Sequence, residues 1–282
     1  MKNTGSRSHG YGIKQSPSFR SEKHVPDMSF KQNIIIKDDP TLLAKKAAEI
    51  FAVSAKSCLD KKEPFTVALS GGSTPRRMHK MLATEPYIQD IPWQKIHIFW
   101  VDERCVPQDS PESNYGTAKR DFIDEVPIPQ KHVHWITSEP SPRMSAKEYQ
   151  KTLKIFFSFV SLRIPRFNLI FLGMGVDGHI ASLFPGQKSL YEKEKLVLAV
   201  KGGNPNMNRI TMTLPLLNQA HHIVFLITGE AKSRTVQKVL EDSKIRLPAQ
   251  KIRPLDGQVT WLMDRGAAAL LRRAHHHEDI EG

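Results

Sequence analysis

The sequence predicts an α/β fold: a parallel or mostly parallel sheet with helices on both faces, in a single domain. From residue 32 onward, short β-rich runs alternate with amphipathic helical stretches along the 282-residue chain. Some runs, such as FNLIFLG at 167–173, are almost continuously apolar, as strands buried on both faces are. No convincing internal repeat and no Pro/Gly-rich linker divides the chain.

The predicted elements follow one another in a regular order. Short apolar runs predict strands at 33–37, 65–70, 95–101, 132–136, 167–173, 222–228 and 258–263. Helical patterns cover 41–59, 145–159, 229–240 and 264–274, and another helix begins at Pro75, since proline suits a first helical turn. Ser145 followed by Glu148 is a capping-box pattern, which places the start of its helix at Ser145.

Two tails flank the predicted domain of residues 32–274. Residues 1–31 are basic and rich in Ser and Gly but lack the apolar stretch of a secretory signal, so we expect a flexible extension. An organelle-targeting role for this extension stays open. Residues 275–282 form a charged tail, in which we expect the triplet His275–His277 to be solvated and not to bind a metal.

Composition narrows the function classes. The chain has two cysteines and no apolar run of about 20 residues, which favours a reducing, cytoplasmic location and excludes a membrane-spanning helix. The chain has 41 Lys and Arg and 29 acidic residues, which give a net charge of +12. This positive charge suits an anionic small substrate. No basic helix, zinc-finger spacing or aromatic-basic interleaving accompanies this charge, so we expect no specific nucleic-acid partner.

The loop SGGSTPRR follows the second predicted strand. Gly71 and Gly72 let the backbone approach a ligand closely, and Ser73 and Thr74 supply hydroxyl groups. Together with Ser70 and the N-terminus of the following helix, they can cradle a phosphate. An ordinary turn between a strand and a helix is the alternative, and the spacing is not that of a Walker loop.

Charged residues follow the third predicted strand. Asp102, Glu103 and Arg104 lie at the edge where open α/β sheets bind ligands. Arg104 can neutralise a phosphate or a developing oxyanion, although the three side chains can equally form a structural ion-pair cluster. Arg209, before a Thr-rich strand, is a further candidate anion contact or a surface charge at the strand end.

The stretch GMGVDGH at 173–179 has two interpretations. Its glycines match the dinucleotide-binding spacing G-x-G-x-x-G, but they lie past the midpoint of the chain, and Phe184-Pro185-Gly186 cuts short any following helix. The alternative is a turn that presents Asp177 and His179 for hydrolysis, because an imidazole can accept a proton from water near neutral pH. A histidine that is merely bonded into the turn remains possible on this stretch alone.

Taken in order, these motifs resemble the 6-phosphogluconolactonases. The matching stretches are SGGSTP, DER with a following ESNY, GMGVDGHIASLFPG and NRITMTLPLLN, together with FLITGEAK, LPAQKIRP and WLMDRGAA. The resemblance spans residues 32–274. It implies a Rossmann-like sheet and hydrolysis of 6-phospho-D-glucono-1,5-lactone to 6-phosphogluconate, without cofactor or metal, by a monomer or small homo-oligomer.

The resemblance also implies residue roles. His179 would be the general base that activates water, Asp177 would position it, and Arg104 would supply positive charge. Residues Ser70 to Thr74, with Arg209, would hold the phosphate of the sugar-phosphate lactone. Two positions depart from the family pattern. Ile180 stands where a threonine is usual and where deaminases commonly have isoleucine, and Asn204 stands near the place of a usual lysine, with Lys201 displaced.

Two alternative functions compete with this hypothesis. Glucosamine-6-phosphate deaminases of the same superfamily carry a glutamate where this chain has Phe184, and a tyrosine where it has Arg104. A catalytically silent sugar-phosphate sensor would carry a DNA-binding helix-turn-helix, for which residues 1–31 are too short and too poor in apolar residues. Both comparisons favour the lactonase.

Overall fold

The structure, a computed structural model, describes residues 1–2, 31–59, 63–137, 141–158 and 164–272. The predicted tails at 1–31 and 275–282, including the triplet His275–His277, therefore lie almost wholly outside the described residues. Within the described ranges, no helix is long and apolar enough to cross a membrane.

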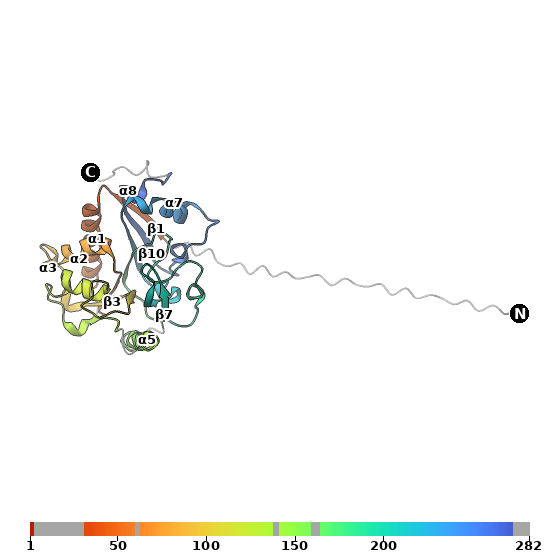
Figure 1. Cartoon of the computed structure of the whole chain (residues 1–282), viewed down its shortest axis with the longest axis horizontal. Helices are drawn as coiled ribbons and strands as arrows, with labels where there is room; N and C mark the ends of the chain where they lie inside the picture. The colour runs from red at the N-terminus through yellow and green to blue at the C-terminus, as the bar shows by residue number, and fades with distance from the viewer. Residues whose placement is uncertain (3–30, 60–62, 138–140, 159–163, 273–282) are drawn as a thin grey trace.

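A seven-stranded parallel sheet forms the centre of the molecule, with the order β1-β10-β9-β6-β2-β3-β5. Its strands are β1 (Lys31–Lys37), β2 (Phe65–Leu69), β3 (Ile96–Trp100), β5 (Val133–His134), β6 (Leu169–Leu172), β9 (His222–Ile227) and β10 (Gln258–Asp264). The α-helices are α1 (Pro40–Lys56), α2 (Ser73–Leu82), α3 (Tyr87–Asp90), α4 (Asn114–Ala118), α5 (Pro142–Ser158), α6 (Leu214–Leu217), α7 (Ser233–Glu241) and α8 (Arg265–Ala268). Helices α1 and α2 lie on one side of the sheet and α7 on the other, so the predicted α/β class is confirmed (Figure 1).

A second, three-stranded antiparallel sheet lies beside the first. It has the order β4-β8-β7 and consists of β4 (Asp102–Arg104), β7 (Val197–Gly202) and β8 (Met207–Met212). Helix α5 packs against β7 and β8. Of this sheet, the sequence patterns predicted only the Thr-rich strand at Arg209, which is β8 and contains that arginine. The sheet places Arg104 directly opposite Arg209 in the register of β4 and β8.

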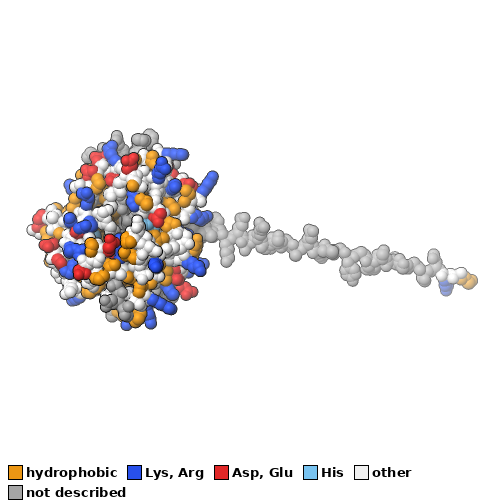
Figure 2. All heavy atoms as spheres, viewed as in Figure 1, with side chains coloured by type: hydrophobic (Ala, Val, Ile, Leu, Met, Phe, Trp, Pro, Cys, Tyr) orange, Lys and Arg blue, Asp and Glu red, His pale blue; other side chains and the backbone are white. Residues whose placement is uncertain are grey.

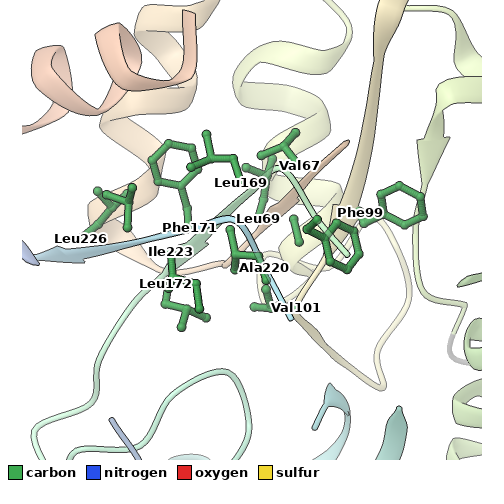
Figure 3. Close-up of a cluster of buried hydrophobic side chains, with 14 of the residues drawn as sticks. Val67, Leu69, Phe99, Val101, Leu169, Phe171, Leu172, Ala220, Ile223 and Leu226 are labelled. Carbon is green, nitrogen blue, oxygen red and sulfur yellow. The ribbon is translucent and has the colours of Figure 1, made fainter. Parts of the chain in front are cut away.

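The hydrophobic core fills both faces of the central sheet. Strands β2 and β6 are buried along their whole length, as their apolar sequences require. Figure 3 shows Phe171 and Leu172 of β6 on opposite sides of the ribbon, each among side chains of neighbouring strands. Phe171 stacks on Phe51 of α1, with ring centroids 6.4 Å apart, which fixes that helix against the sheet. The core thus makes the carboxyl ends of β2, β6 and β9 a rigid platform.

Several predicted helix boundaries were wrong. Helix α2 begins at Ser73 instead of Pro75, so Gly72 is its N-cap. Helix α5 begins at Pro142, and the hydroxyl of Ser145 donates a hydrogen bond to the carbonyl of Ser141 within the first turn, so the capping-box prediction fails. The predicted closing helix shortens to α8, which Asp264 caps through the N–H of Ala267.

The 3₁₀- and π-helical segments connect these elements. They are η1 (Trp93–Lys95), η2 (Lys119–Ile123), η3 (Gln130–His132), η4 (Lys188–Tyr191), η5 (Glu230–Lys232) and η6 (Pro248–Lys251). Segment η5 takes up the first turn of the helix that was predicted to begin at residue 229. On the face shown in Figure 2, basic side chains are scattered among acidic and hydrophobic ones, so the charge excess is not gathered there into one band.

Candidate active site

A pocket of about 250 Å³ opens at the carboxyl ends of the central strands. This is the edge where open α/β sheets bind ligands. The loops after β2, β3, β6 and β9 supply its walls, and β8 closes one side. The lining residues are Ser70, Gly71, Gly72, Ser73, Thr74, Pro75, Asp102, Arg104, Asn114, Gly173, Met174, Gly175, His179, Ala181, Arg209, Leu226, Ile227, Thr228 and Lys232. With the exception of Asp177, every predicted site residue lines this pocket.

The loop after β2 leads directly into the ten-residue helix α2. Gly72 adopts φ +105° as the N-cap, a conformation that side chains disfavour, and the first N–H groups of α2 border the pocket. Thr74 Oγ1 lies 2.8 Å from Thr228 Oγ1, which ties the start of α2 to the end of β9. This end of the pocket therefore combines a positive helix end with hydroxyl groups, as an anion site requires.

Ser70 has a structural role in this loop. Its hydroxyl donates to the carbonyl of Phe171 at 2.9 Å and accepts a longer hydrogen bond from the N–H of Gly173. These contacts join the ends of β2 and β6 at the floor of the pocket. Ser73 is exposed, so its hydroxyl is the more accessible of the two.

His179 and Asp177 form a pair at the pocket wall. The Nδ1 atom of His179 lies 2.5 Å from Asp177 Oδ1, and the same oxygen accepts the backbone N–H of His179 at 3.1 Å. Partial burial alone would raise the pKa of Asp177, but the backbone N–H and the imidazole of His179 outweigh burial and lower it. The carboxylate is thus held ionised beside Nδ1, and Nε2 is the nitrogen that can take a proton from water.

The glycines of this turn serve the pair and not a dinucleotide. A Cβ atom on Gly175 would lie 2.1 Å from His179 Nδ1 and 2.5 Å from Asp177 Oδ1, so only glycine leaves room for the contact. No helix begins between Gly173 and Gln187, a stretch that the structure describes in full. The dinucleotide interpretation, which needs a helix N-terminus here, therefore fails.

Two arginines face the pocket from the small sheet. Arg104 donates from Nη1 to the carbonyl of Glu112 at 2.7 Å and to Asn114 Oδ1 at 2.8 Å. Arg209 is 6% exposed, donates from Nε to the carbonyl of Gly202 at 3.0 Å and lies over the ring of Phe184. Burial lowers the pKa of Arg209, and the charge of Asp102 opposes that shift. The two cations stand side by side, which favours a ligand with negative charge.

Lys232 is a pocket residue that the motif analysis did not single out. It ends η5, lines the pocket and lies near the charge of Asp177. Burial lowers the pKa of Lys232, and the charge of Asp177 opposes this shift. The stretch FLITGEAK, which ends in Lys232, was the sequence pattern that could have indicated this residue. Spacing alone does not reveal that the lysine lines the pocket.

The two departures from the family pattern have different positions in the structure. The side chain of Ile180 is fully buried in the core and does not line the pocket. Lys201 and Asn204 are exposed at the β7–β8 hairpin and do not line it either. Among the described residues, no group of three or more His, Cys, Asp and Glu is arranged to hold a metal ion. The pocket lining combines Arg104, Arg209 and Lys232 with His179, which pairs with Asp177.

Comparisons with known proteins show which sequences and structures the chain resembles. A family model described as glucosamine-6-phosphate isomerases/6-phosphogluconolactonase matches residues 38–261. A 6-phosphogluconolactonase of Nostoc sp. is 35% identical over 245 residues, which cover 86% of this chain and 99% of that one. A probable chloroplastic 6-phosphogluconolactonase of Oryza sativa subsp. indica is 37% identical over 240 residues, covering 82% and 72% of the two chains. The solved 6-phosphogluconolactonase of Trypanosoma cruzi is similar with a TM-score of 0.77 at 27% identity, covering 86% and 98%.

Proposed function

The chain belongs to the glucosamine-6-phosphate isomerase/6-phosphogluconolactonase family, and from this membership and its pocket we propose that it is a 6-phosphogluconolactonase. It would hydrolyse 6-phospho-D-glucono-1,5-lactone to 6-phospho-D-gluconate, the second step of the oxidative pentose phosphate pathway. The observation that carries the proposal is the His179–Asp177 pair at the wall of a pocket lined with cations.

Phosphate anchoring comes first in the proposed mechanism. The N-terminus of α2, with Ser73 and Thr74, and the side chain of Lys232 all belong to the pocket lining. A dianionic phosphate gains both helix-dipole and charge-assisted interactions at such a place. Fixing the phosphate there orients the sugar ring, so that the lactone carbonyl is held near His179 and the arginines.

Proton transfer to His179 follows. A water molecule attacks C1 of the lactone while Nε2 of His179 takes its proton, and Asp177 stabilises the resulting imidazolium through Nδ1. The carbonyl oxygen becomes an oxyanion, which Arg104 stabilises, with Arg209 beside it. The tetrahedral intermediate then collapses, the C1–O5 bond breaks, and the proton passes from His179 to O5.

The deaminase alternative is less well supported. Phe184 occupies the place of the expected deaminase glutamate, and its ring lies 4.8 Å from the imidazole of His179. An apolar ring at that place supplies no carboxylate for the histidine. Arg104 also stands where a deaminase has tyrosine, and its cation suits a developing oxyanion.

A cytoplasmic location is part of the proposal. Both Cys58 and Cys105 are free thiols, which fits a reducing compartment. The rice relative is named chloroplastic, so targeting by residues 1–31 is the alternative, and fusion of these residues to a fluorescent reporter separates the two. The oligomeric state, monomer or small homo-oligomer, stays a prediction.

The direct test supplies the purified protein with freshly generated 6-phosphogluconolactone and measures 6-phosphogluconate with a coupled dehydrogenase. The lactone hydrolyses spontaneously, so the rate must be compared with a protein-free control. We expect fast turnover that exceeds this background, and no ammonia release from glucosamine 6-phosphate. Ammonia release without lactone turnover would replace the proposal with the deaminase.

A further inference from the structure

Arg104 is held by one side chain of the active-site loop. Its Nη1 atom donates to Asn114 Oδ1 at 2.8 Å, and its other recorded acceptor is the backbone carbonyl of Glu112. An arginine side chain has several rotatable bonds, so its guanidinium needs such acceptors to keep one orientation. Asn114 Oδ1 and the Glu112 carbonyl therefore together hold Nη1 of Arg104 in place, and Asn114 supplies the side-chain contact.

Hydrogen bonds fix both the side chain and the backbone of Asn114. It is 4% exposed, and its Nδ2 donates to the carbonyl of Asp102 at 2.9 Å and to Asp102 Oδ1 at 3.1 Å. The other oxygen of Asp102 accepts the hydroxyl of Ser182 at 2.6 Å. The amide can thus present only its oxygen to Arg104, because flipping it would place that oxygen against two acceptors.

Glu103 fixes the backbone on which Asn114 stands. Its buried carboxylate accepts the N–H groups of Arg104 and Asn114 at 2.7 Å and of Tyr115 at 2.8 Å, and the hydroxyl of Ser113 at 3.1 Å. Burial raises the pKa of Glu103 to about 7, against the opposing pull of the three N–H groups. Asn114 therefore stands on a backbone held by hydrogen bonds to a single buried side chain.

Residues 70–74, the proposed phosphate loop, contact the same amide oxygen. A Cβ atom built on Gly71 would lie 1.7 Å from Asn114 Oδ1, so the loop backbone packs directly on the atom that orients Arg104. Any side chain at residue 71 would push the amide away from Arg104. The two halves of the pocket, phosphate loop and arginine, meet at Asn114.

We propose that Asn114 is a positioning residue. Its amide oxygen holds the guanidinium of Arg104 next to the lactone carbonyl, while the loop at Gly71, which packs on the same oxygen, holds the phosphate. This inference rests on the proposed function, in which Arg104 stabilises the oxyanion. It assigns to Asn114 an effect on the reaction that operates only through Arg104.

A double-mutant cycle tests the proposal with wild type, Asn114→Ala, Arg104→Ala and the double variant. We expect Asn114→Ala to lower kcat about 10- to 100-fold, with KM changed by less than about threefold, because misplacing a stabilising group costs rate more than binding. In the Arg104→Ala background, the same substitution should cost less than about threefold. An equal loss of kcat in both backgrounds would overturn the proposal and leave Asn114 a purely structural residue.

Asn218→Ala is the matched control. Asn218 also bridges two segments, donating to the carbonyl of Lys251 and accepting the N–H of Arg253, but it does not line the pocket. It should keep kcat within about twofold of wild type despite a similar loss of hydrogen bonds.

The same cycle is run on the Kd of 6-phosphogluconate, whose carboxylate replaces the lactone carbonyl. Absence of lactonase activity in the wild type would contradict the proposed function, while the binding cycle would still decide on the coupling of Asn114 to Arg104. Wild-type kcat in Arg104→Ala would remove that arginine from the mechanism and overturn the inference with it.

Discussion

At the scale of single residues, the charges around the pocket divide into two groups. Asp177 pairs with His179, while Lys232 and the two arginines supply positive charge to the pocket lining. Arg104 and Arg209 lie opposite each other in the small sheet, whereas Lys232 ends η5, near the charge of Asp177. We therefore expect the phosphate and the lactone of one substrate molecule to contact cations that come from different elements.

Lys232 is expected to bind the phosphate, in place of the lysine that the family pattern puts near Asn204. Lys232→Ala should raise KM for the lactone and weaken 6-phosphogluconate binding about tenfold or more, since a charge-assisted contact is lost, while kcat changes less. Steady-state kinetics and calorimetry measure both effects. Lys201→Ala, an exposed lysine outside the pocket, is the control. A larger effect of Lys201→Ala than of Lys232→Ala would reverse the assignment.

Motifs predicted some site residues well and others not at all. Asp177 and His179 are two positions apart in one turn, so the sequence carries their proximity directly. Asn114 reaches Arg104, and Lys232 reaches the pocket, only through the packing of separate loops at the sheet edge. Ser70 was assigned to phosphate, yet its hydroxyl joins β2 to β6, a contact between residues 70 and 171 that no local pattern encodes. The predicted roles themselves stay predictions.

At the scale of elements, α2 is anchored to η2 by the half-exposed Arg76 and the buried His79. Arg76 donates to both carboxylate oxygens of Asp121, at 2.8 Å and 3.0 Å, and His79 packs against Phe122. His79 is 2% exposed, and neither ring nitrogen has a hydrogen-bond partner among the described residues. Burial lowers the pKa of His79 to about 4, with Asp121 opposing the shift. The helix that follows the loop after β2 therefore has an uncharged imidazole on its buried face.

The pH dependence of stability should reveal this imidazole. Between pH 6.5, where a free histidine titrates, and pH 4, the unfolded chain binds a proton that folded His79 does not. Stability is therefore lost as pH falls through this window, by on the order of 3 kcal/mol from this group. His79→Leu should flatten the fall in urea-unfolding free energy by a comparable amount. Parallel curves for the two proteins from pH 7.5 to pH 4.5 would exclude His79 as a source of acid sensitivity.

The strands of the central sheet were predictable and, apart from β8, the small sheet was not. Long apolar runs such as 167–173 and 222–228 identify buried parallel strands because helices cover both faces. Strand β4 has three residues, too few for a periodic pattern, and β7 alternates only partly. Helix α5 begins before its apparent capping box because Pro142 can occupy the first turn, and Ser141 Oγ accepts the N–H of Met144.

At the scale of the whole molecule, the pocket joins segments from most of the chain. Residues between 70 and 232 line it, and they come from both sheets. A ligand that binds the folded state alone must therefore stabilise the fold as a unit. The net charge of +12 favours anionic ligands in addition to the local contacts.

Ligand stabilisation should depend on the phosphate. At about 100 times its Kd, 6-phosphogluconate should add about 2.7 kcal/mol and raise Tm by roughly 5 °C or more. Gluconate, which has the carboxylate and hydroxyls but no phosphate, should shift Tm far less at the same concentration. Scanning calorimetry measures both shifts. Equal shifts with the two compounds would contradict phosphate anchoring.

The central claim is that His179 is the base of a lactone hydrolysis, and kcat of His179→Ala tests it most directly. His222→Ala serves as the matched control. His222 begins β9, contacts Thr260 of the neighbouring strand β10 and does not line the pocket. The account predicts that His179→Ala loses on the order of 10²- to 10⁴-fold in kcat, toward the spontaneous rate, while His222→Ala keeps its activity. A folded His179→Ala variant with wild-type kcat would contradict the account.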